Sequence, residues 1–158
     1  MKMKITKTAS PKKKRFWRPP KNSKKFNCSN KIFIDRSESS FNHCQLINNQ
    51  EVYSFLKEQG FTKYKVGQLS WEKQIYLFKN AKIIVGAHGA AFANLAFCSP
   101  KTKIIEIKPK NHPNYVSKTI SKINDLNIKI IETPKVNKKI RSQGDILLDI
   151  KKLKKLLN

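Results

Sequence analysis

The stretch that decides the fold is Ile83-Ile84-Val85-Gly86-Ala87-His88-Gly89-Ala90-Ala91. Its first three residues are β-branched and apolar, which is typical of a strand buried in a sheet. The residues that follow are small, and they interrupt the apolar run with two glycines and a histidine. We therefore predict a buried strand that ends in a tight loop and leads into a helical segment over about 90–97, which Ser99-Pro100 ends.

Short apolar runs recur along the chain and alternate with segments of helical period. Because the runs are continuous, we expect helices to cover both faces of the sheet. The pattern predicts an α/β fold with a Rossmann-like, doubly wound parallel sheet over residues 31–158. The predicted strands cover residues 31–35, 61–66, 82–85, 103–107 and 128–131. The predicted helices cover 49–59, 90–97, 113–123 and 149–157, and a further helix is capped by Ser70 and contains Ile75, Leu77 and Phe78.

Residues 1–30 differ from the rest of the chain, because they hold 11 Lys or Arg and no acidic residue. Prolines at 11, 19 and 20 and the absence of any strand or helix period predict a flexible basic arm or linker. Its centre, Pro11-Lys12-Lys13-Lys14-Arg15, has the form of a nuclear localisation signal. The alternative is a solvated tail.

The formal net charge of +24 raises the alternative of a basic nucleic-acid-binding protein. Such a protein would bind any DNA or RNA with a steep dependence on salt. The sequence contains no helix-turn-helix, RNP, KH or zinc-finger pattern. We therefore expect no specific nucleic-acid partner.

Three further features bear on the compartment. No run of about 18 uncharged apolar residues occurs, and no apolar segment follows the basic N-terminus, so we expect neither a transmembrane segment nor a secretory signal. The three cysteines form no CxxC pair, which predicts reduced thiols and no zinc site. Together they favour a cytoplasmic protein. The Lys-rich amphipathic helix over 149–157 either packs on the domain or lies at the inner face of a membrane.

The loop after Val85 has the residue types of an anion site. Gly86 and Gly89 permit a positive φ and a close backbone approach, and the small neighbours Ala87 and Ala90 leave N–H groups open at a helix N-terminus. His88 can add a hydrogen bond to a phosphate oxygen. The alternative is a tight turn in which His88 bonds a backbone carbonyl. The spacing matches neither GxGxxG nor a P-loop, so it predicts neither a dinucleotide nor a P-loop nucleotide.

The block from Ser70 to Ile107 resembles the C-terminal domain of glycosyltransferase family 61, and the likeness spans about residues 31–157. Its most specific part is the Gly-x-His-Gly-Ala loop followed by Asn94 and Glu106. Upstream, Ile32 to Arg36 is similar to the family's strand ending in Ser-Arg, although Asp35 replaces the usual Ser or Thr. A second basic position expected nearby is Cys44-Gln45 here, with His43 as a substitute. The matching segments are 69–74, 81–91, 94–95 and 103–107.

This resemblance implies inverting, metal-independent transfer of a sugar from a nucleotide sugar, usually a UDP-sugar, to a glycan or polysaccharide acceptor, as in capsular polysaccharide synthesis. It implies no cofactor and no metal ligand. The implied architecture is GT-B, of which this chain would be a single, donor-binding half. The N-terminal half commonly holds the acceptor and supplies the general base. We therefore expect either a separate N-terminal domain chain as partner, or a non-catalytic donor-binding half.

The resemblance also implies roles for single residues. Gly86, Ala87, His88, Gly89 and Ala90 would cradle the donor diphosphate. Arg36 and His88 are the candidate catalytic residues, with Arg36 neutralising charge on the leaving group. Glu106 would accept hydrogen bonds from the ribose hydroxyls. Asn94 and Gln74 would contact the donor or brace the loops. The alternatives are a solvated cation for Arg36 and a surface carboxylate paired with a lysine for Glu106.

Overall fold

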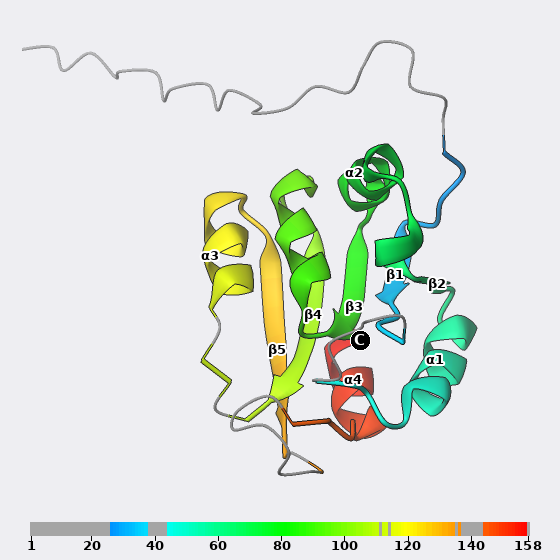
Figure 1. Ribbon diagram of the computed structural model, residues 1–158, viewed down its shortest axis with the longest axis vertical. Helices are drawn as coiled ribbons and strands as arrows, with labels where there is room; N and C mark the ends of the chain where they lie inside the picture. Colours follow the sequence, from blue (N-terminus) through cyan, green and yellow to red (C-terminus); the bar gives the residue numbers. More distant parts are fainter. Residues whose placement is uncertain are drawn as a thin grey trace, which may run out of the picture.

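The computed structural model describes residues 26–37, 44–110, 112–113, 115–134, 136 and 144–157. Within them, all neighbouring strands pair in parallel, in the order β2-β1-β3-β4-β5 (Figure 1). This confirms the predicted parallel sheet. The strands are β1 (Lys31–Ile34), β2 (Thr62–Tyr64), β3 (Ile83–Ala87), β4 (Lys103–Pro109) and β5 (Asn127–Thr133).

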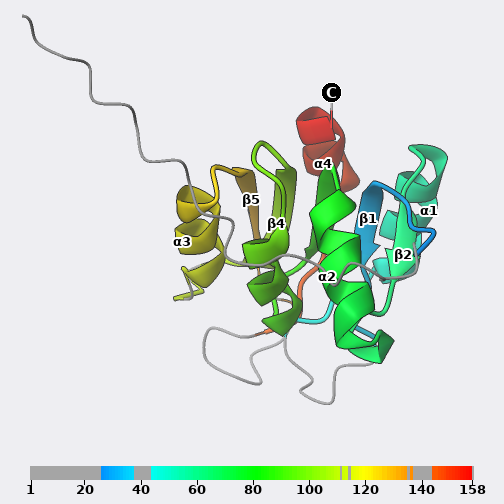
Figure 2. The ribbon, with the colours of Figure 1, turned by 90° about the horizontal axis from the view of Figure 1, so that it is seen from above.

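The helices lie on both faces of this sheet, as Figure 2 shows. Two helices, α1 and α4, cover one face, and α2, the 3₁₀ helix η2 and α3 cover the other. The doubly wound, Rossmann-like arrangement is therefore confirmed. The helices are α1 (Asn49–Glu58), η1 (Val66–Gln68), α2 (Trp71–Asn80), η2 (Ala90–Phe97), α3 (Val116–Ile123) and α4 (Ile150–Leu157).

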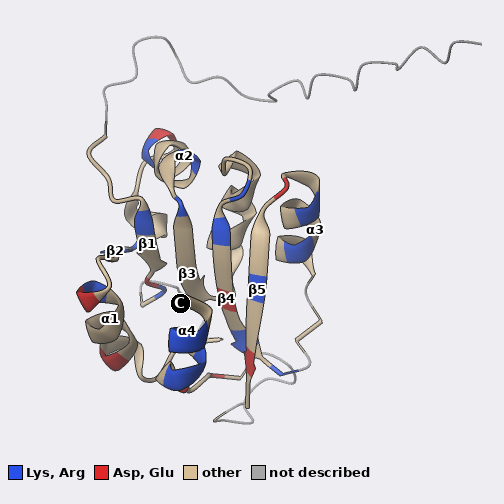
Figure 3. Ribbon diagram, turned by 180° about the vertical axis from the view of Figure 1, so that it is seen from behind, with Lys and Arg blue, Asp and Glu red and all other residues tan. Residues whose placement is uncertain are grey.

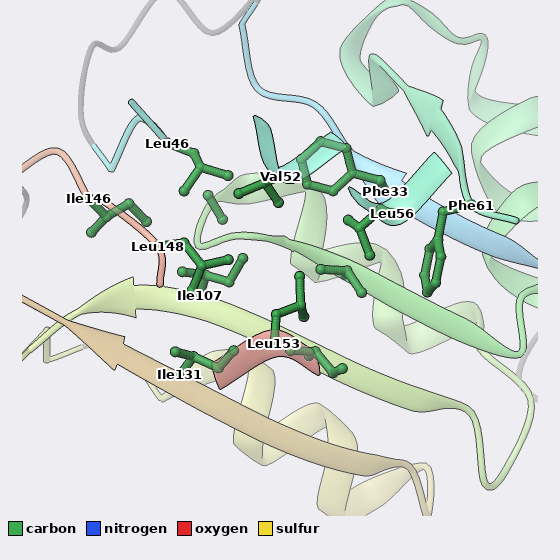
Figure 4. Close-up of a cluster of buried hydrophobic side chains, with 13 residues drawn as sticks. Phe33, Leu46, Val52, Leu56, Phe61, Ile107, Ile131, Ile146, Leu148 and Leu153 are labelled. Carbon is green, nitrogen blue, oxygen red and sulfur yellow. The ribbon is translucent and has the colours of Figure 1, made fainter. Parts of the chain in front are cut away.

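Each central strand contributes side chains to two separate cores. Phe33, Val85 and Ile105 are aligned across β1, β3 and β4 and pack beneath α1 and α4. Figure 4 labels Phe33 of this core together with Leu56 of α1 and Leu153 of α4. The preceding residues of the three strands, which include Ile84, form the second core beneath α2 and η2. Burial on both faces is the physical reason for the continuous apolar runs in the sequence.

Several helix ends are where the sequence places them. The Ser70 hydroxyl accepts a hydrogen bond from the Lys73 N–H (3.4 Å) and begins α2. An Asp149 carboxylate oxygen accepts from the Lys151 N–H (2.9 Å) at the start of α4. Gly60, with φ of 81°, follows α1 in the left-handed conformation that favours glycine.

Several boundaries differ from the prediction, including both ends of β2 and β5, and three of the differences lie near the loop after β3 or in the strand and helix that follow it. The strand β3 continues through Gly86 and Ala87, because both pair with β4, so the loop begins at His88. β4 extends to Pro109 for the same reason, since it pairs with β5 as far as Thr133. The helix α3 begins at Val116 instead of 113.

The C-terminal helix packs on the domain, as one of the two interpretations expects. Leu153 of α4 is buried, and Ile150, Leu156 and Leu157 pack against the same core. The lysines of α4 are seen in Figure 3, whereas β3 carries no charged residue.

No helix in the described part of the chain is long and apolar enough to cross a membrane. The predicted arm lies outside the described residues up to position 25.

Candidate functional site

The carboxyl ends of β1 and β3 lie side by side, and glycine is needed where they meet. Gly86 is aligned with Ile34 of β1, and a Cβ at Gly86 would lie 2.8 Å from the Ile34 Cβ. Glycine is thus required at position 86 by the proximity of β1, and the predicted close approach of the loop backbone to a phosphate stays a prediction. The predicted positive φ is wrong, because neither Gly86 nor Gly89 is in the left-handed region; Gly89 is extended, with φ 170° and ψ 180°.

Arg36, which follows β1, reaches the loop after β3. Its Nη1 donates a hydrogen bond to the carbonyl oxygen of His88, 52 residues away in the sequence. The guanidinium also lies over Gly89, where an added Cβ would be 2.5 Å from the Arg36 Cζ and Nε. The alternative of a solvated loop cation is therefore wrong. Arg36 and the glycine-containing loop form one site.

Asp35 fixes the turn that carries Arg36. Its side chain is buried, and Oδ1 accepts hydrogen bonds from the Ser37 N–H (3.0 Å) and the Asn49 side-chain amide (3.2 Å). Lys63 of β2 lies 3.7 Å from Oδ2 and balances the carboxylate charge. The turn is thereby tied to α1 and β2. These contacts explain how an aspartate is accommodated where the resemblance to family 61 would place Ser or Thr.

His88 is held by a carboxylate beneath the loop. Its Nδ1 lies 2.5 Å from Oε1 of Glu106, which is completely buried on β4. The other oxygen, Oε2, accepts a hydrogen bond from the Ser117 hydroxyl at 2.5 Å. The His88 side chain therefore bonds a carboxylate and not a backbone carbonyl, and the alternative of a surface Glu106 paired with a lysine is wrong. Contact between Glu106 and a ribose stays a prediction.

A second histidine completes the surroundings of His88. The rings of His88 and His112 are in contact in a tilted arrangement, with centroids 4.2 Å apart and an interplanar angle of 49°. The Nζ of Lys108 donates to the His112 carbonyl (3.3 Å) and lies 3.5 Å from Glu132. Ser117, Lys108 and His112 were not predicted as site residues. One feature of the sequence could have indicated them: Glu106 and Lys108 alternate at the end of an otherwise apolar strand. Charged side chains buried in this way need polar partners nearby.

Comparison with known proteins identifies the family. A model of the family described as glycosyltransferase 61 matches residues 2–105. The chain belongs to glycosyltransferase family 61. No curated protein matches it. The matched range contains Arg36, the loop after β3 and Asn94. It begins before residue 31, where the resemblance in the sequence starts, and it ends one residue before Glu106. It supports glycosyltransferase activity, with a sugar donor and an acceptor as substrates.

Asn94 braces this glycosyltransferase domain internally. Its side-chain amide is buried and donates to the Gln74 Oε1 (2.9 Å), and Gln74 donates in turn to the carbonyl of Leu69 (3.0 Å). These bonds connect η2 to α2. Bracing, one of the two roles considered for Asn94 and Gln74, is therefore observed, and contact of Asn94 with a donor stays a prediction.

The thiol beside the site of this family 61 chain is not a nucleophile at neutral pH. Cys44 is buried, and desolvation raises the pKa of its thiol to about 11, although the nearby Arg36 acts in the opposite direction. Burial raises the pKa of Cys98 to about 12. His43, the suggested substitute for a missing basic residue, lies outside the described residues.

Proposed function

We propose that this chain binds a UDP-linked nucleotide sugar, with its diphosphate at the carboxyl ends of β1 and β3. The sugar is then transferred, with inversion, to a glycan or polysaccharide. One observation carries the proposal: the Arg36 guanidinium lies over Gly89 and is fixed on the His88 carbonyl, beside the first residues of η2. A fixed cation at the start of a helical segment is a favourable place for a phosphate.

Hydrogen bonds within the protein limit which backbone amides are available to an anion. The His88 N–H donates to the Ile107 carbonyl (2.7 Å) and is therefore occupied. The amides of Gly89 and Ala90 come next, and Ala90 is exposed. Small side chains at both positions let an oxyanion approach the backbone closely. The diphosphate would then be bound by these amides from one side and by Arg36 from the other.

Arg36 suits the chemistry of the leaving group. Negative charge grows on the diphosphate as its bond to the sugar breaks, and a cation that is already in place stabilises this charge without reorganisation. Within the described residues, no three His, Cys, Asp or Glu side chains gather as metal ligands. We propose that Arg36 supplies charge stabilisation, and metal-independent transfer is a further part of the proposal.

The pocket beside Arg36 is too small to enclose a nucleotide sugar, which favours a second surface in the complete binding site. The pocket beside Arg36 has a volume of about 80 Å³, whereas pockets for small molecules and cofactors measure roughly 300–1,000 Å³. A nucleotide sugar on this edge would remain exposed on one side. We propose that an acceptor-binding domain, in GT-B fashion, covers the donor and provides the general base. Without it, the chain would bind the donor without transferring the sugar.

Isothermal titration calorimetry with UDP, UDP-GlcNAc and other UDP-sugars tests the proposal on wild type, Arg36→Ala and Lys82→Ala. Lys82 is an exposed cation directly before β3, at the amino ends of the strands and away from the proposed site. It is therefore a matched control for charge alone. We expect UDP binding to be lost in Arg36→Ala and kept in Lys82→Ala. Absence of binding by the wild type at millimolar UDP, or equal weakening by both substitutions, would refute it.

A further inference from the structure

We infer that Glu106 and Ser117 are positioning residues that fix the proton and the orientation of the His88 ring, so that Nε2 is the nitrogen offered to a ligand. The identity of that ligand as a diphosphate rests on the proposed function. The arrangement of the His88 ring is independent of the proposed function, because all contacts that impose it are present in the unliganded protein.

The contacts around Glu106 decide where the His88 proton lies. An ionised carboxylate has acceptors only, and both of its oxygens are used, one by Ser117 Oγ and one by His88 Nδ1, each at 2.5 Å. Nδ1 therefore carries a hydrogen in both the neutral and the charged ring. In the neutral ring the lone pair is on Nε2, and in the imidazolium Nε2 carries the second proton.

Both positioning residues belong to regular elements that are well anchored. Glu106 is inside β4, where it is paired with Gly86 on one side and Ile130 on the other. Ser117 is in the first turn of α3 and is itself buried. The ring of His112 lies against the His88 ring in a tilted arrangement, with centroids 4.2 Å apart, and limits rotation of the imidazole. The loop histidine is thus oriented by groups that belong to the sheet and the helix.

This geometry determines which atom of His88 acts. A protonated Nε2 donates to a phosphate oxygen, and an unprotonated Nε2 accepts a hydrogen bond from a hydroxyl. The His88 side chain is 8% exposed, and no hydrogen bond joins Nε2 to another described residue. A carboxylate that orients a histidine in this way is a common arrangement in catalytic and metal sites. It also gives Glu106 a role different from ribose binding.

Nuclear magnetic resonance of ¹⁵N-labelled histidine measures the tautomer directly in the unliganded chain. The comparison uses wild type, Glu106→Gln, Ser117→Ala and Ser121→Ala. Ser121 is the matched control, since it is one turn along α3, is equally buried, and its hydroxyl has no hydrogen-bond partner in the described part of the chain. His88→Asn assigns the His88 signals among the three histidines.

In the alkaline limit of a pH titration, we expect His88 of the wild type and of Ser121→Ala to show a protonated Nδ1 and an unprotonated Nε2. Glu106→Gln should populate the other tautomer, and Ser117→Ala should shift the equilibrium in the same direction. A wild-type His88 with its proton on Nε2, or a folded Glu106→Gln protein with an unchanged tautomer, would overturn the inference. Amide spectra verify that each variant is folded.

A ligand pair separates positioning from ribose binding. Under our inference, Glu106→Gln weakens UDP and inorganic pyrophosphate alike, by about tenfold, as is usual when a group that orients a ligand-binding residue is changed. If Glu106 instead held the ribose, UDP would weaken and pyrophosphate would not, which counts against the inference. If the wild type binds neither ligand, the proposed function fails, and the tautomer measurement still decides the positioning role.

Discussion

Gly89→Ala is expected to weaken donor binding while leaving the fold intact. The added Cβ would lie 2.5 Å from Cζ and Nε of Arg36 and 2.9 Å from its Nη1. Contacts this short are not tolerated, but the guanidinium is the end of a flexible side chain and can swing away. Because Gly89 is extended, alanine there causes no backbone strain. The substitution therefore acts on the position of Arg36.

The magnitude follows from the contacts that are lost. A half-buried Arg36 that leaves the His88 carbonyl is hydrated again, so we expect a stability loss of about 1 kcal/mol, or roughly 2–4 °C in Tm. A hydrogen bond between a cation and a phosphate is worth about 1.5–3 kcal/mol. Its loss should raise the Kd for UDP by roughly 10- to 150-fold.

Titration calorimetry and thermal denaturation measure the two effects separately. Gly60→Ala is the matched control, because its Cβ would meet nothing within 4 Å but its φ of 81° is unfavourable for alanine. It should lose about 1 kcal/mol of stability and keep its affinity for UDP. Wild-type affinity in Gly89→Ala would refute the role given to Arg36, and unfolding of that variant would refute the expectation that the guanidinium can move away.

Other consequences concern stability. Gly86→Ala places its Cβ 2.8 Å from the Cβ of Ile34, which cannot rotate away. Urea denaturation should therefore show a loss of about 1–3 kcal/mol in the free energy of unfolding, and a neutral result would mean that the strands separate easily. Leu153→Ala leaves a cavity under α4 and should cost about 2–5 kcal/mol by the same measurement; a loss below about 1 kcal/mol would show that α4 is not part of the core. The buried thiols of Cys44 and Cys98, with pKa values of about 11 and 12, keep their protons longer than the unfolded chain, whose thiols titrate near 9.0. The free energy of unfolding should therefore fall above about pH 9, by about 1.4 kcal/mol per pH unit and thiol, and the double alanine variant should lack this part of the slope; identical pH profiles would contradict the burial effect.

The fold could be predicted because its main determinants are local. The β-branched runs through Phe33, Val85 and Ile105 identify buried strands without knowledge of their neighbours. The caps at Ser70 and Asp149 mark helix starts by their own side chains. The end of β3 could not be predicted in this way, because Gly86 and Ala87 extend the strand only through pairing with β4. Pairing is a property of the assembled sheet.

The site was only partly predictable, for the same reason. The loop residues and Arg36 were proposed from motifs, and the structure brings them together across 52 residues of sequence. The roles of the glycines were misjudged, since local conformation suggested a positive φ and the actual constraint is the proximity of Ile34 and Arg36. The link from His88 through Glu106 to Ser117 depends on the register of β3 with β4, which the sequence does not reveal.

The strand crossover explains why these groups meet. The chain leaves β1 toward α1 on one face of the sheet and leaves β3 toward η2 on the other, so the backbone diverges between two neighbouring strands. In doubly wound sheets, this divergence opens the ligand-binding crevice. Gly86, aligned between Ile34 and Glu106, leaves space on the face beneath η2 and α3. His88 follows two residues later and reaches Glu106 diagonally across this space, which joins the loop to the interior of the domain.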